Sequence, residues 1–393
     1  MTELNAAITA FQKGDLVLMM DAASRENEAD LVVAAEKTTE ERIAFMIRHT
    51  SGIICVPMKS ERLRQLGLRD MVDKNTSKHG CSFSVSVDAA DIKDAGVSAR
   101  DRLHTIRLLA DPKTIPGQLT SPGHIFPLKT AEKGLLEREG HTEAAMALTE
   151  LAGLQPAAVI GEVMDDKGRM IRGKDVEQFG REHGIPVISI QDLRQHILRT
   201  KILVKEEVRV KLPTVMGEFE LAMFCTAKGG EAIPALIKGK PKNPALVRVH
   251  SECLTGDVFH SLRCDCHDQL IKSMERIEKE GEGVVIYLAQ EGRGIGLLNK
   301  IKAYHLQEQG LDTLDANIHL GFDADEREYW EAAHILRALG ITKIRLMTNN
   351  PDKIEQLEKL GLNVVERVSH TIEPNEHNKG YLKTKKERFL HKL

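Results

Sequence analysis

Short apolar runs of strand length alternate with helical patterns along the whole chain, and this alternation limits the fold more than any other feature. In the first half, strand-like runs lie near residues 16–20, 31–35, 53–58, 82–87, 157–164 and 185–190, between helical patterns at 38–50, 60–67, 99–110 and 142–152. In the second half, runs at 219–226, 245–250, 284–289 and 344–348 alternate with helical patterns at 268–280, 296–309, 327–339 and 351–360. The pattern predicts the α/β (α+β) class.

The length favours two domains, because the chain has 393 residues and a single domain usually has about 100 to 200. A stretch dense in Lys, Arg and Glu at 194–211 separates the two halves of the pattern. We therefore expect two mixed α/β domains in tandem, over residues 1–199 and 200–393. The sequence shows no internal repeat with a period of about 20 to 50 residues, which argues against a solenoid.

Composition and charge exclude several classes of protein. Hydrophobic residues make up 41% and charged residues 29%, as in ordinary globular chains. The formal net charge is only -3, so no chain-wide positive field attracts nucleic acid or anionic membranes. No apolar run approaches the roughly 18 residues that cross a bilayer, and the first residues lack the pattern of a secretory signal. We expect a cytoplasmic protein that binds neither nucleic acid nor membrane.

An acidic loop lies between two of the strand-like runs of the first half. From Asp21 to Asp30 it carries four carboxylates and one arginine. A charged hairpin is the simplest interpretation, but magnesium prefers oxygen ligands and usually takes one or two carboxylates. A second segment, Arg-Glu-Gly-His-Thr at 138–142, begins a predicted helix, where backbone amides and the helix dipole attract a phosphate. A lone histidine there is more often a cap than a ligand, so the two segments predict a metal site only together.

These segments resemble a known family. Arg-Glu-Asn-Glu-Ala-Asp-Leu at 25–31 and the segments at 49–58, 122–128 and 138–145 are similar to 3,4-dihydroxy-2-butanone-4-phosphate synthase, from the N-terminus to about residue 199. The resemblance implies that ribulose 5-phosphate is converted into this four-carbon phosphate and formate, with Mg²⁺ or Mn²⁺. It implies that Glu26 and His141 bind the metal and that His124 and Glu162 are catalytic. The residues it implies for binding the sugar phosphate are Arg25, Glu26, Asp30, Arg138, Glu139, Gly140, His141, Thr142 and Glu162.

Three of the six cysteines crowd into one window of the second half. Their spacing is Cys-x10-Cys-x-Cys, at Cys253, Cys264 and Cys266. Structural zinc usually has four protein ligands, whereas catalytic zinc has three and leaves one position for water, so three thiolates fit an open site. The alternatives are a closed site completed by a nearby histidine, such as His267, and buried free thiols. We interpret the remaining cysteines as core or loop thiols: Cys55, Cys81 and Cys225.

A glycine-rich loop supports a ligand site in the same half. The segment 290–296 follows a strand-like run and opens a helical pattern, an arrangement in which backbone amides meet a phosphate. Its spacing matches neither the dinucleotide fingerprint nor the P-loop, so the loop alone is a weak signal. Tyr304, further along the same helical pattern, either donates a proton or a hydrogen bond to the ligand or simply packs.

Together with the cysteines, the segments at 248–257, 261–266, 290–299 and 348–351 closely resemble GTP cyclohydrolase II, over about 208–393. The resemblance implies opening of the guanine imidazole ring, with release of formate and pyrophosphate, by an enzyme that uses zinc at the three cysteines and magnesium on the GTP phosphates. It implies Asp325 as proton acceptor and Arg327 as the arginine that attacks the phosphate. A guanidinium with a pKa above about 12 is a poor nucleophile, so we expect Arg327 to act at least partly by stabilising phosphoryl charge. The residues it implies for GTP binding are Arg248, Val249, His250, Ser251, Glu252, Gln269, Glu291, Gly292, Arg293, Thr313, Thr348 and Lys353.

We therefore expect a bifunctional enzyme of riboflavin biosynthesis, acting on two small molecules, and the resemblance favours a homodimer built through the first half. The chain departs from the cyclohydrolase pattern at His267 and at 330–334. One alternative is that only the synthase is active and the second half is a structural or dimerising module. Another is a zinc-dependent nucleic-acid-binding module, which the near-neutral charge and the aromatic content of 4% argue against.

Overall fold

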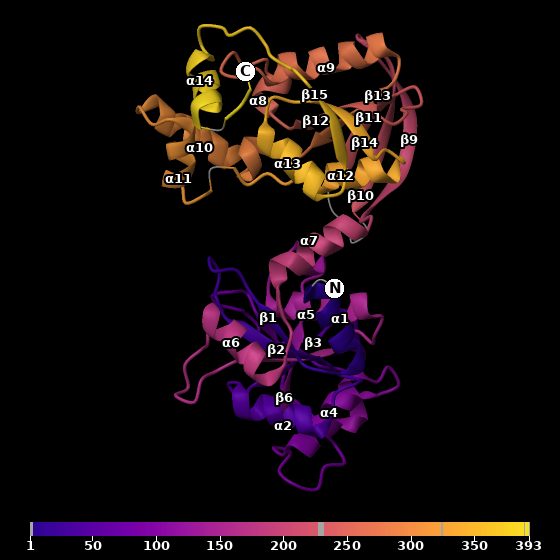
Figure 1. Ribbon diagram of the computed structural model, residues 1–393, viewed down its shortest axis with the longest axis vertical. Helices are drawn as coiled ribbons and strands as arrows, with labels where there is room; N and C mark the ends of the chain where they lie inside the picture. Colours follow the sequence, from indigo (N-terminus) through magenta and orange to yellow (C-terminus); the bar gives the residue numbers. More distant parts are fainter. Residues whose placement is uncertain (1–2, 227–231, 324, 389, 393) are drawn as a thin grey trace. The chain divides into compact units, whose positions relative to one another are not determined.

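The computed structural model describes residues 3–226, 232–323, 325–388 and 390–392, with the backbone alone for Thr313, Gly380, Tyr381, Lys383 and Thr384. The chain divides into two compact units, residues 1–197 and 198–393, and each is built on its own sheet (Figure 1). The mixed α/β class predicted for both halves is confirmed. Within the described ranges, no helix is both long and apolar enough to cross a membrane.

The first unit is a mixed sheet covered by helices on both faces. Its strands run in the order β4-β6-β3-β7-β2-β1-β8, with β5 paired to β6. The strand bounds are β1 Val17–Met20, β2 Ala29–Ala34, β3 Ile54–Met58, β4 Ser82–Phe83, β5 Val87–Ala89, β6 Leu119–Lys129, β7 Ala158–Glu162 and β8 Val187–Ser189. The helix bounds are α1 Glu3–Lys13, α2 Glu40–His49, α3 Ser60–Gln65, α4 Ala99–Ala110, α5 His141–Ala152, α6 Lys174–His183 and α7 Ile190–Thr200, with short 3-10 turns at Pro116–Gln118 and Gly134–Leu136.

Strand β2 shows why both faces of this sheet are covered. All of its residues are buried, and successive side chains of a strand point to opposite faces. Leu31 packs in one core with Ile43 of α2, while Val32 packs in the other with Leu148 of α5. Helices α2 and α4 accordingly lie on one face of the sheet, and α1 and α5 lie on the other (Figure 1).

The second unit joins an antiparallel half-sheet to a parallel one, in the order β15-β14-β12-β13-β11-β10-β9. The strand bounds are β9 Val204–Thr214, β10 Gly217–Thr226, β11 Ile233–Lys238, β12 Ala245–Ser251, β13 Gly283–Leu288, β14 Lys343–Met347 and β15 Asn363–Val368. The helix bounds are α8 Leu254–Asp257, α9 Cys266–Glu280, α10 Leu297–Glu308, α11 Thr313–His319, α12 Trp330–Ala338, α13 Pro351–Lys359 and α14 Lys379–Arg388, with a 3-10 turn, η3, at Glu291–Gly294. Strands β12, β13 and β14 are parallel, so their carboxyl ends meet at one edge, where ligands of open α/β sheets bind.

Several elements were absent from the expected pattern. Strand β6 includes Pro122 and Gly123, residues typical of turns, and the first half of the strand is largely exposed, so it shows no apolar run. The charged stretch at 194–211 is also ordered, as the end of α7 and most of β9. Its charges pair along the sheet surface, where Arg209 contacts Glu206 at 2.7 Å and Glu220 at 3.1 Å. A charged run therefore marks a solvated strand here and not a linker.

Candidate active sites

The acidic loop of the first unit is the turn of the hairpin formed by β1 and β2, and Asp21 holds it closed. Its carboxylate accepts backbone hydrogen bonds from Glu26 at 3.1 Å and Glu28 at 2.9 Å, and Arg25 binds it at 2.8 Å. Asn27 takes a left-handed conformation, with φ at 57°, so that the chain can reverse between the two bonds. The loop that was expected from the sequence is therefore rigidly built around one buried carboxylate.

Helix α5 begins at His141 and brings this imidazole to the acidic loop. Its Nδ1 lies 3.9 Å from Oε2 of Glu26 and 3.7 Å from Oδ1 of Asp30. The ligand atoms of Asp21, Glu26 and His141 all lie within 4.8 Å of one another. Both His141 Nε2 and Asp30 Oδ1 are buried and have no hydrogen-bond partner among the described residues. Buried polar atoms usually have a partner, so this set of donors fits a bound cation.

The electrostatics of the cluster agree with that fit. Asp30 in β2 pairs directly with Glu162 in β7. Burial raises the pKa of Asp30 to about 6, the carboxylates nearby add to the rise, and His141 opposes it. Desolvation and then the neighbouring carboxylates also raise the pKa of Glu162. Several negative charges in one pocket repel each other, and a divalent cation would relieve that repulsion.

The start of α5 carries the remaining residues expected to grip a phosphate. Arg138 is anchored by Glu143 at 2.7 Å and by the carbonyl oxygen of His79 at 3.0 Å. Gly140 precedes the helix, and a Cβ atom there would lie 2.7 Å from Nη1 of Arg138. Thr142 is buried, whereas Glu139 turns away to pair with Arg194. Because Gly140 has no side chain, the guanidinium of Arg138 can lie close to the backbone at the start of α5.

His124 lies apart from this cluster. It is on β6, where its Nδ1 lies 2.7 Å from Oδ2 of Asp88 and its backbone amide donates to Oδ1 of the same residue at 2.9 Å. Strand β3 separates β6 from β7. At the usual strand spacing, the Cα atoms of His124 and Glu162 are therefore about 10 Å apart. Sequence reasoning missed Asp88, and also His79, whose Nε2 lies 3.7 Å from Oε1 of Glu26. No motif in the sequence pointed to either residue.

The three crowded cysteines of the second unit do form one cluster. Their sulfur atoms all lie within 4.8 Å of one another, and Cys253 and Cys264 are 3.7 Å apart. Cys253 follows the end of β12, and Cys266 begins α9. Gly256 lies against the group, where a Cβ atom would come within 2.8 Å of the Cys264 sulfur. Three thiols at such separations fit a metal ion.

The structure does not support a fourth ligand from His267. Among the described residues, the donor group at this place contains the three thiols alone. The His267 ring packs instead on the ring of His260, with centroids 3.9 Å apart, and its Nδ1 lies 3.3 Å from the carbonyl oxygen of Asp257. The two imidazoles therefore pack against each other beside the thiols. The described residues thus offer three ligands at this place, which agrees with an open site.

A lysine that sequence reasoning missed completes the thiol cluster. Lys300 Nζ lies 3.1 Å from the sulfur of Cys253 and 2.7 Å from Oε1 of Glu291. The neighbouring cysteines and then Lys300 lower the pKa of Cys253. Burial opposes the charge on Lys300, but Tyr304, Glu291 and Cys253 raise its pKa. The only sequence signal was that Lys300 lies one helical turn before Tyr304.

Tyr304 keeps its proton near neutrality, because burial raises the pKa of the phenol to about 12 although Lys300 opposes the rise. It faces the same cavity as the thiols. This position is compatible with both interpretations left open above, a donor to the ligand and a residue that packs.

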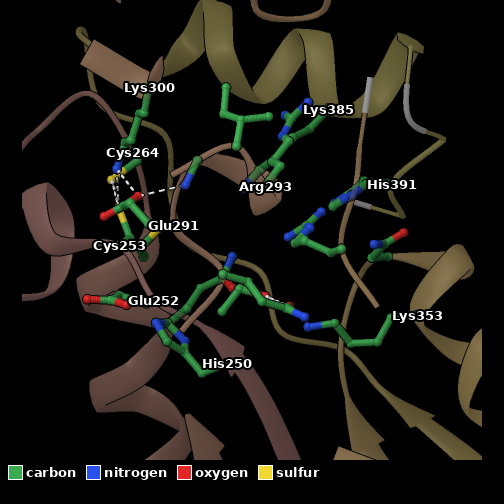
Figure 2. A pocket seen from close by; sticks show the side chains of 18 of the residues that line it. His250, Glu252, Cys253, Cys264, Glu291, Arg293, Lys300, Lys353, Lys385 and His391 are labelled. Atoms are coloured by element: carbon green, nitrogen blue, oxygen red, sulfur yellow. Dashed lines mark hydrogen bonds and ion pairs between the residues drawn. The ribbon is translucent and has the colours of Figure 1, made fainter. Parts of the chain in front are cut away.

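The thiols open into a cavity of about 1110 Å³, including its mouth, at the carboxyl ends of the parallel strands (Figure 2). Predicted residues that line it are Arg248, His250, Ser251, Glu252, Gln269, Glu291, Gly292, Arg293, Tyr304, Arg327, Thr348 and Lys353. Val249 is instead part of the buried core and offers its carbonyl oxygen to Lys353 at 2.6 Å. Asp325 lies behind Arg327 and binds its Nε at 2.8 Å. The side chain of Thr313 lies outside the described part of the chain.

The glycine-rich loop takes its shape from two successive left-handed residues, Gly292 with φ at 64° and Arg293 with φ at 65°. A non-glycine residue in this region is strained, and such strain is common where a ligand binds. Figure 2 shows Cys253, Cys264 and Lys300 toward one end of the cavity and Arg293, with several other cations, toward the other. Polar lining residues that were not predicted as site residues are Gln290, Lys300, Gln307, Asn317, Asn349, Asn350, Lys385 and His391.

The geometry thus defines two kinds of site: an oxygen-rich cation site beside a helix start, and a thiol-rich metal site in a cationic cavity. Family models match both units, as 3,4-dihydroxy-2-butanone 4-phosphate synthase over residues 5–196 and GTP cyclohydrolase II over residues 205–369. The riboflavin biosynthesis protein RibBA of Phocaeicola vulgatus is 49% identical over 392 residues, covering 99% of this chain and 97% of that protein. The RibBA of Aquifex aeolicus is 50% identical over 390 residues, covering 98% and 96%.

A solved structure agrees over both units. RibBX, a two-domain 3,4-dihydroxy-2-butanone 4-phosphate synthase from A. baumannii, has a TM-score of 0.70 and 30% identity, covering 95% of this chain and 100% of that one. The chain therefore belongs to the family of bifunctional riboflavin biosynthesis proteins, with a 3,4-dihydroxy-2-butanone 4-phosphate synthase followed by a GTP cyclohydrolase II. It is an enzyme with a lyase and a hydrolase activity. The alternative of an inactive second half finds no support.

Proposed function

We propose that Glu26 and His141 hold Mg²⁺ or Mn²⁺ in the first unit and that ribulose 5-phosphate binds beside them. The observation that carries the proposal is the buried Nε2 of His141, which has no hydrogen-bond partner among the described residues while Nδ1 lies within 4 Å of two carboxylates. When bound, the cation would polarise the carbonyl and hydroxyl oxygens of the sugar. Arg25 holds the loop through Asp21, so its own position beside the substrate is fixed.

The protein groups around this cation divide the remaining work. Arg138 and the backbone amides from Glu139 to Thr142, at the start of α5, bind the phosphate, because both attract an anion. Asp30 and Glu162 move protons at the sugar carbons, because they pair across β2 and β7 beside the proposed cation and Asp30 lies 3.7 Å from His141. Asp88 orients the imidazole of His124, which acts on the substrate from β6, on the far side of β3.

We propose for the second unit that Cys253, Cys264 and Cys266 hold Zn²⁺. When bound, zinc would lower the pKa of a water molecule to about 7 and so supply hydroxide for attack on the guanine C8 atom. Tyr304 donates a hydrogen bond to the opening ring, and Lys300 balances the negative charge of the thiolates. Glu252 and Gln269 contact the nucleotide, with the other predicted lining residues named above.

The phosphates of GTP, with their Mg²⁺, lie at the cationic end of the cavity. Arg327 stabilises the charge on the phosphoryl group that is cleaved, because Asp325 holds its guanidinium in place at 2.8 Å. Asp325 is the proposed proton acceptor of the reaction. We also propose a homodimer built through the first unit and a cytoplasmic location, both of which follow the family resemblance.

Reciprocal substitutions test the two sites. Glu26→Gln and His141→Ala should abolish formate release from ribulose 5-phosphate, because each removes a metal ligand, and should leave GTP turnover intact. Cys264→Ser should do the reverse. Titration of each purified variant with Mn²⁺, followed by electron paramagnetic resonance, and its zinc content report metal binding apart from activity. A folded variant that loses both activities would contradict the proposal of two independent sites.

A further inference from the structure

The C-terminal segment reaches back into the nucleotide cavity of the second unit. It lies beyond the part of the chain that the cyclohydrolase family model covers. Helix α14 lies beside α10 and α11 (Figure 1). Two side chains of the C-terminal segment, Lys385 and His391, line the cavity. Neither was singled out by any motif. We call the described residues of this segment, 379–388 and 390–392, the strap.

Three contacts fix the strap on the rest of the unit. Lys385 forms an ion pair of 2.9 Å with Asp265, whose side chain is only 1% exposed. Arg388 pairs with Asp312 at 3.0 Å, on the loop that begins α11. The backbone amide of Lys392 donates to the carbonyl oxygen of Asn349 at 2.9 Å. These partners come from three separate loops, so the strap is held across the cavity and not along one side of it.

The first contact connects the strap with the loop that carries Cys264 and Cys266. Asp265 lies between Cys264 and Cys266. Its carboxylate is buried, and Lys385 Nζ lies 2.9 Å from its Oδ1. Gln269 donates to the same carboxylate and accepts a hydrogen bond from Arg248. The strap is therefore bonded to the network that orders both the thiols and a predicted nucleotide-binding arginine.

The second cavity residue, His391, lies among positive charges. Its cationic neighbours are Lys385, Arg327, Arg293 and Lys353. Burial and then these charges lower the pKa of His391 to about 3. Figure 2 shows Lys385, His391, Lys353 and Arg293 together at the end of the cavity away from the thiols. Cations gathered in a partly desolvated cavity repel each other, and a polyanion removes that cost.

We propose that the strap is part of the GTP site and that Lys385 and His391 bind the triphosphate. The proposal deepens the cyclohydrolase activity and does not depend on the synthase. Guanine C8 must reach the thiol end for hydrolysis, so the phosphates of an extended nucleotide point toward the opposite end, where the strap supplies two of the cavity's nitrogen donors. The strap thereby selects a triphosphate over shorter phosphates.

The test compares His391→Gln and Lys385→Gln with Lys386→Gln, which changes the next residue of α14, on its exposed side. We expect the KM for GTP and the inhibition constant of inorganic triphosphate to rise about tenfold or more in the first two variants, because each loses a hydrogen bond to a charged group. The inhibition constant of GMP should change by less than about twofold, because GMP lacks the distal phosphates. Lys386→Gln should leave all three constants unchanged.

Zinc content and formate release from ribulose 5-phosphate show that each variant is folded and loaded. If Lys385→Gln alone loses zinc, that lysine acts through Asp265 and His391→Gln decides the question. Equal losses for GMP and triphosphate in His391→Gln would mean that the strap only supports the cavity, and that result would overturn the proposal. Unchanged constants in both variants would overturn it as well. Loss of turnover with no change in triphosphate inhibition would also overturn the proposal, because the strap would then affect the chemical step and not the binding of the phosphates.

Discussion

At the scale of single residues, charge compensation decides what each site can hold. In the first unit, His141 faces a group of carboxylates, and its Nε2 has no hydrogen-bond partner among the residues that the structure describes. In the second, three thiols have a buried lysine as their nearest cation. Hard oxygen donors suit Mg²⁺ or Mn²⁺, and soft sulfur donors suit Zn²⁺. The two units therefore offer donor atoms that suit different metals.

Lys300 provides a test at this scale. In Lys300→Met the thiolate of Cys253 and the carboxylate of Glu291 lose their shared cation, and a hydrogen bond to a charged group is worth about 1.5 to 3 kcal/mol. We expect kcat for GTP to fall about tenfold or more, measured as formate release at saturating GTP. The matched control is Lys302→Met, on the exposed side of the same helix, which should retain full activity. Normal kcat in Lys300→Met would show that the lysine only packs.

At the scale of elements, the ends of three parallel strands bring the second site together. Cys253 follows β12, Glu291 follows β13 and Thr348 follows β14. The loop after β14 is fastened to the end of β15, where Asn349 donates to the carbonyl oxygen of His370 at 2.7 Å. His370 in turn lies 2.7 Å from the carbonyl oxygen of Gln269 in α9. This buried imidazole thus connects two of the elements that line the cavity.

His370 makes the stability of the second unit depend on pH. Burial and then Arg248 lower its pKa from 6.5 to about 3. The unfolded chain therefore binds a proton between these values that the folded chain does not, and the free energy of unfolding decreases as the pH falls below about 6.5. At pH 5 this contribution amounts to about 2 kcal/mol.

Denaturant unfolding at pH 7 and pH 5 measures the effect. The fluorescence of Trp330 is specific for the second unit, since the chain has one tryptophan and it lies in α12. His370→Gln should lose less stability than the parent protein between the two pH values, by about 2 kcal/mol. His377→Gln, at an exposed position, should behave like the parent. Equal slopes in His370→Gln and the parent would rule out this imidazole as the source.

At the scale of the whole molecule, the chain carries two complete cores. The first unit buries apolar residues on both faces of its sheet, and the second has its own core around Phe219 and Ile277. The imidazole of His334, in the segment that departs from the cyclohydrolase pattern, lies 2.7 Å from the carbonyl oxygen of Leu198. That segment therefore anchors the start of the second unit, which accounts for its histidine without a catalytic role.

Metal removal should separate the two units. Binding of an ion to the folded state alone stabilises that state, so a zinc-selective chelator should lower the melting temperature reported by Trp330 by several degrees. Formate release from ribulose 5-phosphate, assayed with added Mg²⁺, should keep its own thermal midpoint. A joint shift of both midpoints would mean that the units unfold as one. No shift in either would contradict a zinc ion at the three thiols.

The sequence by itself determined the strands and helices that have regular apolar patterns, the acidic loop, the cysteine spacing and the family. These features are local, because periodicity and turn chemistry act over a few residues. The resemblance already implied that His141 meets Glu26, but only the tertiary structure decided that Lys300 meets Cys253, that the strap meets the loop of Cys264 and Cys266, and that His124 lies apart from Glu162. Such contacts depend on strand order and register, which pair residues far apart in the chain and leave no local pattern.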